Sequence, residues 1–129
     1  MVIEINNLTN FKINQKSFSQ VAKIVLKGEN RETESLSLAF VEKEEIKKLN
    51  KRFRNKDKST DVLSFDIREG KFLGEIVICP EVVKEKKEDI IEVFIHGILH
   101  LCGYDHERSS QEERAMEKKQ ENYLKNIKK

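Results

Sequence analysis

The three histidines of the chain lie close together, at positions 96, 100 and 106. His96 and His100 are four residues apart, so on a helix their side chains share one face, with Cβ atoms about 5–6 Å apart. Gly103 can adopt the left-handed backbone that reverses a chain after a helix and returns His106 towards the first two rings. Three imidazole ligands leave one tetrahedral position open, which is typical of a catalytic zinc ion. We therefore predict that His96, His100 and His106 bind one Zn²⁺ ion.

Three alternatives to this interpretation stay open. A lone histidine on an apolar helix is usually a hydrogen-bonded core residue, although three at this spacing are costly to bury without a common partner. Nickel, copper and iron also accept imidazole ligands. The spacing His-x3-His-x2-Gly-x2-His is that of metzincin proteases, in which a glutamate follows the first histidine as general base. Here that position is Gly97, so a metallopeptidase would keep the metal and lack its base.

A second candidate site is the basic segment 47–58, in which seven of twelve residues are Lys or Arg although the whole chain carries a net charge of only +2. Such a concentration of positive charge favours binding of a polyanion. Arg54 follows the apolar Phe53 at the end of a predicted helix, and its planar guanidinium suits a phosphate or the charge of a phosphoryl transition state. We predict that Arg54 is catalytic, and the candidates for binding the polyanion are Arg52, Arg54, Lys56 and Lys58. For the remaining lysines, a solvated helix face is an equally good interpretation.

Elements that could position these residues follow from apolar periodicity. Alternating or β-branched apolar residues predict strands over 2–5, 35–41, 62–67 and 72–79, the last two as a hairpin or as adjacent strands. Helical spacing predicts helices over 19–27 (ended by Gly28), 42–53, 80–87, 89–102 and 110–124. The helix over 89–102 is apolar almost all round and carries the first two histidines, so it should be buried. Apolar stripes of the other helices include Ile24, Phe53 and Ala115.

Length and composition limit the class of protein. The 129 residues fit one domain, over residues 1–129. Cys79 and Cys102 lie in apolar runs, where a free cysteine behaves as a small core residue. No signal peptide and no apolar run long enough to cross a bilayer is evident. The sequence therefore predicts a cytoplasmic protein with reduced thiols and no membrane partner.

Three segments of the chain resemble the YbeY family of bacterial metallo-endoribonucleases. Residues 96–106 resemble the signature His-Gly-x-Leu-His-Leu-x-Gly-Tyr-Asp-His. Residues 49–65 resemble the segment that runs from Leu-Asn through an arginine to Thr-Asp-Val-Leu-Ser-Phe, and residues 73–79 resemble the strand Leu-Gly-Asp-Ile-x-Ile-Cys. The chain departs from the family pattern at Ser59 and Asp66, where proline is common, and at Glu75, where aspartate is usual.

The resemblance implies an α/β (α+β) domain, with helices on a small mixed four-stranded sheet and a zinc-binding helix near the C-terminus. It implies Zn²⁺ as the cofactor, held at the three histidine positions, and it places the important arginine of the family at Arg54. It also implies cleavage of single-stranded RNA during 16S rRNA 3′-end maturation and ribosome quality control, with the ribosomal small subunit as partner.

No general base is evident. Asp105 and Glu75 are weak candidates, and Asp105 is better interpreted as a group that orients a histidine. Two other functions stay open: a non-catalytic, zinc-stabilised RNA-binding assembly factor, and a metzincin-like metallopeptidase.

Overall fold

A computed structural model describes residues 3–104 and 109–128. Its strands form one sheet in the order β1-β2-β4-β3, in which β2 pairs in parallel with β1 and β4, and β3 pairs antiparallel with β4. The strands are β1 (Ile3–Asn7), β2 (Ser35–Phe40), β3 (Val62–Glu69) and β4 (Phe72–Ile78). The helices are α1 (Gln15–Gly28), α2 (Lys43–Arg54), α3 (Pro80–Glu85), α4 (Ile90–Leu101) and α5 (Ser110–Ile127). The predicted mixed four-stranded sheet with helices packed on it is confirmed.

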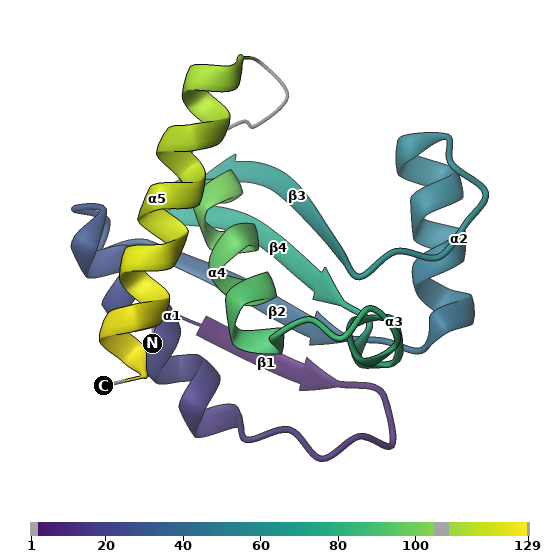
Figure 1. Cartoon of the computed structure of the whole chain (residues 1–129). Coiled ribbons are helices and arrows are strands. Elements are labelled where there is room, and N and C mark those ends of the chain that lie inside the picture. Colours follow the sequence, from purple (N-terminus) through teal and green to yellow (C-terminus); the bar gives the residue numbers. More distant parts are fainter. Residues whose placement is uncertain (1–2, 105–108, 129) are drawn as a thin grey trace.

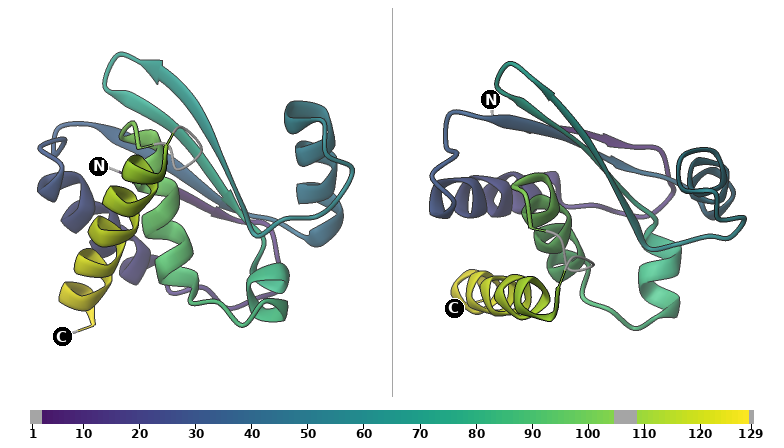
Figure 2. Two further views of the ribbon diagram at one scale, coloured as in Figure 1. Left: turned by 45° about the horizontal axis from the view of Figure 1, so that its top comes forward. Right: turned by 90° about the horizontal axis from the view of Figure 1, so that it is seen from above.

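The main core lies between one face of the sheet and two helices. Helices α1 and α4 pack directly on this face, and α5 packs on α4 and α1 from outside (Figures 1 and 2). The alternating residues Leu36, Leu38 and Phe40 of β2 are all buried, as their period of two predicts. No helix among residues 3–104 and 109–128 has the length and apolarity needed to span a membrane.

Helix α4 is the buried helix that its sequence predicts. The Asp89 carboxylate caps its start by accepting a hydrogen bond from the Ile91 N–H at 2.9 Å. A Cβ atom on Gly97 would lie 3.0 Å from Cγ2 of Ile76, so the glycine lets α4 pack closely on β4. After the helix, Gly103 has a φ of 107°, the positive value expected for a chain reversal.

A second, smaller core lies on the opposite face of the sheet, where α2 packs at the end of the strands (Figure 1). Ile46 of α2 is fully buried there, in contact with side chains from β3 and β4. The buried members of this core are Val41, Ile46, Leu63, Val77, Cys79 and Val82. Helix α2 is therefore attached to the sheet through a smaller apolar surface than α4.

Several predicted details are wrong. Ile24 is 43% exposed, Phe53 is 53% exposed, and Ala115 is exposed as well, so these residues point away from the cores.

Helix α1 begins at Gln15, four residues earlier than predicted, because Asn14 caps it and Phe18 joins the core. The helix does end at Gly28. Gly28 leaves room for the Tyr123 ring, which a side chain at this position would collide with. The positive φ that often follows a helix is adopted by Asn30 instead.

Candidate functional site

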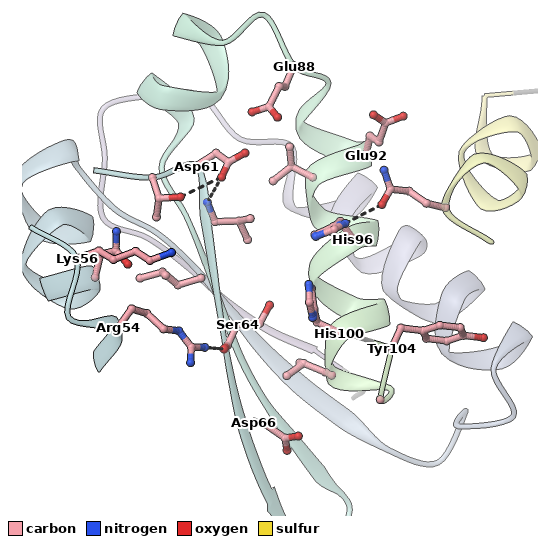
Figure 3. Close-up of a pocket in the computed structure, with 18 of the residues that line it drawn as sticks. Arg54, Lys56, Asp61, Ser64, Asp66, Glu88, Glu92, His96, His100 and Tyr104 are labelled. Carbon is pink, nitrogen blue, oxygen red and sulfur yellow. Dashed lines mark hydrogen bonds between the residues drawn. The ribbon is translucent and has the colours of Figure 1, made fainter. Parts of the chain in front are cut away.

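A groove of about 950 Å³ separates α4 from the end of α2 and the loop that follows it, with β3 as its floor (Figure 3). We call the side formed by α4 the α4 wall and the side formed by Arg54, Lys56 and Lys58 the α2 wall. The groove contains both predicted sets of residues, although 42 positions separate Arg54 from His96 in the sequence. Its charged and imidazole side chains are Arg54, Lys56, Lys58, Asp61, Asp66, Arg68, Glu88, Glu92, His96 and His100.

On the α4 wall, His96 and His100 lie one turn apart, with ring centroids 4.7 Å from each other. Nδ1 of His96 lies 2.9 Å from Oε1 of Gln120 on α5. Because an amide oxygen only accepts, we assign the proton to Nδ1, which leaves the lone pair on Nε2. An imidazole oriented by an oxygen at its other nitrogen is the usual arrangement of a metal ligand.

The third predicted ligand, His106, and the predicted orienting residue, Asp105, lie outside the described residues. Among residues 3–104 and 109–128, no group of three or more His, Cys, Asp or Glu side chains could hold a metal ion. Burial raises the pKa of the Cys102 thiol to about 11, so it is protonated near neutral pH. A protonated thiol is a poor metal ligand.

Arg54 reaches across the end of β3 towards the groove. It donates a hydrogen bond to the carbonyl oxygen of Ser64 at 2.6 Å, and the Ser64 hydroxyl in turn faces the Gly97 carbonyl of α4 (Figure 3). Strand β3 is at the edge of the sheet, where carbonyl groups lack a partner strand, and Arg54 hydrogen-bonds one of them. The guanidinium thereby stands in the groove opposite the two histidines.

The loop of the α2 wall is held by a buried amide. Asn50 is only 3% exposed and its side-chain amide N–H donates to the Lys58 carbonyl oxygen at 2.9 Å, while the main-chain carbonyl of Asn50 accepts from the Lys56 N–H at 3.3 Å. Lys56 and Lys58 line the groove as a result. Arg52 is not among the lining residues and instead lies over the Phe53 ring, 5.3 Å from its centroid.

Of the two weak candidates for a general base, Asp105 lies outside the described residues and Glu75 does not line the groove. Glu75 accepts a hydrogen bond from Ser37 at 3.1 Å, on the face of the sheet opposite α4. Gly97 faces Ile76 in the core, and a side chain there would collide with the sheet. A protease-like glutamate therefore has no space at this position.

A pair of carboxyl groups closes one end of the groove. Asp61 accepts from the Val62 N–H at 2.9 Å, and Glu88 lies at the same end of the groove, at the start of the α4 wall (Figure 3). Desolvation raises the pKa of Glu88 to about 7, and the neighbouring Asp61 carboxyl, with its negative charge, raises it further. A carboxyl group with this pKa can both accept and donate a proton near neutral pH.

Arg68 is a further residue that sequence reasoning missed. Its guanidinium donates to the Leu101 carbonyl oxygen at 2.9 Å, at the negative end of the α4 dipole, and pairs with Asp66 at 2.9 Å. Arg68 also has a φ of 51°, an unusual value for a residue other than glycine. The β3–β4 hairpin is thus tied to the end of the helix that carries the histidines.

Some of the missed residues left a signal in the sequence. Gln120 follows Met116 by four residues and precedes Tyr123 by three, so it is a polar residue on an apolar stripe. Asn50 follows Ile46 by four residues in the same way. Asp61 and Glu88 left none, because their pairing depends on how β3, β4 and α3 bring two loops together.

Comparisons with known proteins agree with the geometry. The profile of the family "Endoribonuclease YbeY" matches residues 4–128. An "Endoribonuclease YbeY" from Thermotoga maritima is 40% identical over 100 residues, which cover 71% of this chain and 67% of that protein. One from Persephonella marina is 36% identical over an alignment that covers 89% of this chain and 84% of the relative.

A solved structure agrees as well. A solution structure of a Thermotoga maritima protein superposes with a TM-score of 0.68 at 33% identity, covering 98% of this chain and 89% of that one. The family profile spans almost the whole chain, and the groove lies between two of the segments that first indicated the resemblance. This chain belongs to the YbeY family of endoribonucleases.

Proposed function

We propose that this protein is a zinc-dependent endoribonuclease that cuts single-stranded RNA in the groove between the α4 and α2 walls. The observation that carries the proposal is the position of Arg54 across the groove from His96 and His100 (Figure 3). The family supports a role in processing ribosomal RNA. We extend this to 16S rRNA 3′-end maturation and quality control on the small ribosomal subunit, in the cytoplasm.

The donor set fits a zinc ion. His96 and His100 offer imidazole nitrogens from one helix face, and Gln120 orients the first ring. We propose His106 as the third ligand on its spacing alone. When bound there, zinc supplies a Lewis acid and lowers the pKa of a bound water towards about 7.

The residues of the chain have separate tasks in this mechanism. Arg54 binds the scissile phosphate and stabilises the charge that develops on its oxygens during cleavage. Lys56 and Lys58 attract the neighbouring phosphates of the strand. The Asp61–Glu88 pair, with a raised pKa at Glu88, accepts or donates a proton near neutral pH.

The test combines metal analysis with RNA cleavage. His100→Ala should lose bound zinc and all cleavage, whereas Arg54→Ala should retain zinc and lose at least about 100-fold in cleavage rate, the range found when one charge-stabilising donor is removed. Arg114→Ala, an exposed arginine on α5 outside the groove, is the matched control and should behave as wild type.

Two outcomes would replace the proposal. If His100→Ala lowers the melting temperature but leaves RNA affinity intact, and no preparation cleaves RNA, the protein is a zinc-stabilised RNA-binding factor. Cleavage of peptides but not of RNA by the zinc-loaded protein would indicate a metallopeptidase.

A further inference from the structure

Two phenylalanines and two arginines form a cluster on the outer side of the α2 wall. The rings of Phe53 and Phe65 meet edge to face, with centroids 5.3 Å apart. The Arg52 guanidinium lies 5.3 Å from the Phe53 centroid, and the Arg54 guanidinium lies 5.7 Å from the Phe65 centroid. We call Arg52, Phe53, Arg54 and Phe65 the aromatic cluster.

The exposure of Phe53 requires an explanation. Four large apolar side chains are exposed in the described part of the chain, namely Leu8, Ile24, Phe53 and Ile67, and only Phe53 is aromatic. An isolated exposed apolar residue is ordinary. Phe53, however, is 53% exposed, with the Arg52 guanidinium over its ring and the Arg54 guanidinium over the adjoining Phe65 ring, so the surface offers a flat apolar ring in positive surroundings. Compensating the helix dipole of α2 would explain the arginines but not the ring between them.

The aromatic cluster is continuous with the groove through Arg54. This guanidinium lines the groove and donates to Ser64 on the edge strand β3 (Figure 3). It also lies over the Phe65 ring. A phosphate bound at Arg54 would therefore have its adjoining nucleotide beside Phe53. The positive charge at the end of α2, from Lys51, Arg52 and Arg54, also favours a nucleic-acid strand at this place.

We propose that the aromatic cluster is a stacking subsite for one unpaired base of the RNA strand whose phosphate binds at Arg54. This inference rests on the proposed function and names the feature of the substrate that the site recognises. Bases of a duplex are covered by their neighbours, whereas an unpaired base offers a free face to an aromatic ring. The aromatic cluster therefore selects single-stranded RNA over duplex RNA.

The chain contains no tryptophan, so a single tryptophan can report on the subsite. Phe53→Trp keeps an aromatic face there, and base stacking should quench its fluorescence when a 2′-O-methyl single strand binds. Leu8→Trp is the matched control, because Leu8 is 67% exposed and follows β1 at the opposite edge of the sheet. Its fluorescence should not change.

Affinity provides the second measurement. Phe53→Leu keeps an apolar side chain but removes the aromatic face, and should weaken single-strand binding by about 5- to 150-fold. The affinity for the same strand annealed to its complement should stay unchanged, as should both affinities of Leu8→Ala. A strand with one abasic nucleotide at the stacked position should bind wild type and Phe53→Leu equally.

The inference is overturned if Phe53→Leu binds single strands as tightly as wild type, or if both tryptophans are quenched equally. In that case the exposed Phe53 ring would be better explained as a contact site for a partner protein. RNA cleavage by wild type would still support the proposed function. If wild type binds neither single-stranded nor duplex RNA, the subsite and the proposed function fail together.

Discussion

The two walls of the groove are built in different ways. Helix α4 belongs to the main core, where seven of its residues are buried: Val93, Phe94, Ile95, Gly97, Ile98, Leu99 and Leu101. Both ends of the helix are also tied to other elements, at its start by the ion pair of Asp89 with Lys128 at the end of α5 and at its end by Arg68. His96 and His100 are consequently held by the most deeply packed helix of the protein.

The α2 wall has much less support. Only Ile46 and Asn50 of α2 are buried, and the loop after it is held by hydrogen bonds to Asn50. Segments with few buried apolar contacts open locally at a lower free energy than the core. The groove thus places the proposed metal ligands His96 and His100 on a rigid element, where geometry must be exact, and the proposed phosphate-binding groups on one that can adjust to a strand.

The largest expected effect distinguishes the two walls directly. Ile46→Ala removes a fully buried side chain from the second core and should cost about 2–5 kcal/mol of local stability. We expect α2 amides to exchange faster and RNA affinity to fall, while zinc binding at α4 persists. Amide hydrogen exchange together with metal analysis measures both.

Ile98→Ala is the matched control for this prediction. Ile98 is also fully buried, but it lies on α4. Its replacement should lower the global free energy of unfolding, so that exchange rises across the sheet and zinc is lost with the fold. If the two variants gave the same exchange pattern, the walls would belong to one cooperative unit and the comparison would be wrong.

A smaller effect should be confined to the α4 wall. Gln120→Leu keeps the bulk of the side chain but removes the acceptor of the His96 Nδ1–H bond, and should lower zinc affinity by about 10- to 100-fold. RNA affinity should stay unchanged because the α2 wall is untouched. Competition with a zinc chelator measures the affinity.

Gln111→Leu is the corresponding control, since it changes an exposed glutamine at the start of the same helix. Equal zinc affinities for wild type and Gln120→Leu would show that the ring needs no partner on α5 to bind the metal.

The two walls also differ in how far the sequence predicts them. The α4 wall depends on local spacing, because the i, i+4 histidines and the apolar circumference of α4 are properties of one helix. Gly97 was correctly excluded as a general base because glycine has no side chain that could accept a proton. The α2 wall depends on packing between distant segments: the apolar stripe placed Phe53 inward, yet α2 covers too little of the sheet to bury it.

Pairs that are far apart in the sequence were the least predictable. Arg54 was identified from its position after Phe53, but its contact with Ser64 follows from where the loop returns to β3. Gln120 meets His96 only because α5 folds back onto α4. Hydrophobic periodicity predicts which face of a helix is buried, and it does not specify which neighbour that face meets.

The smallest effect concerns the end of the groove where the two walls meet. Asp61 belongs to the loop after α2 and Glu88 precedes α4, so the interaction of these two carboxyl groups couples the walls. Lys86 and Glu92 also act on the Glu88 carboxyl, the first lowering its pKa and the second raising it. Ionisation of Glu88 places its charge near the negative charge of Asp61, which is unfavourable.

The direction of the pH effect follows from the pKa of Glu88, which is about 7 in the folded protein against 4.5 for the free side chain. Between these values the folded state binds more protons than the unfolded state, so the free energy of unfolding falls as the pH rises. Glu88→Gln should remove this slope. Because Glu88 is exposed and water screens its interactions, we expect a difference below about 1 kcal/mol between pH 5 and pH 8.

Amide exchange at both pH values shows where this loss acts. In wild type, α2 amides should exchange faster at pH 8 than the intrinsic rate increase accounts for, and α4 amides should not. Glu121→Gln, an exposed glutamate on α5, is the control and should retain the wild-type slope. If Glu88→Gln kept that slope too, the carboxyl pair would not join the walls, and the mobility of α2 would depend on Ile46 and Asn50 alone.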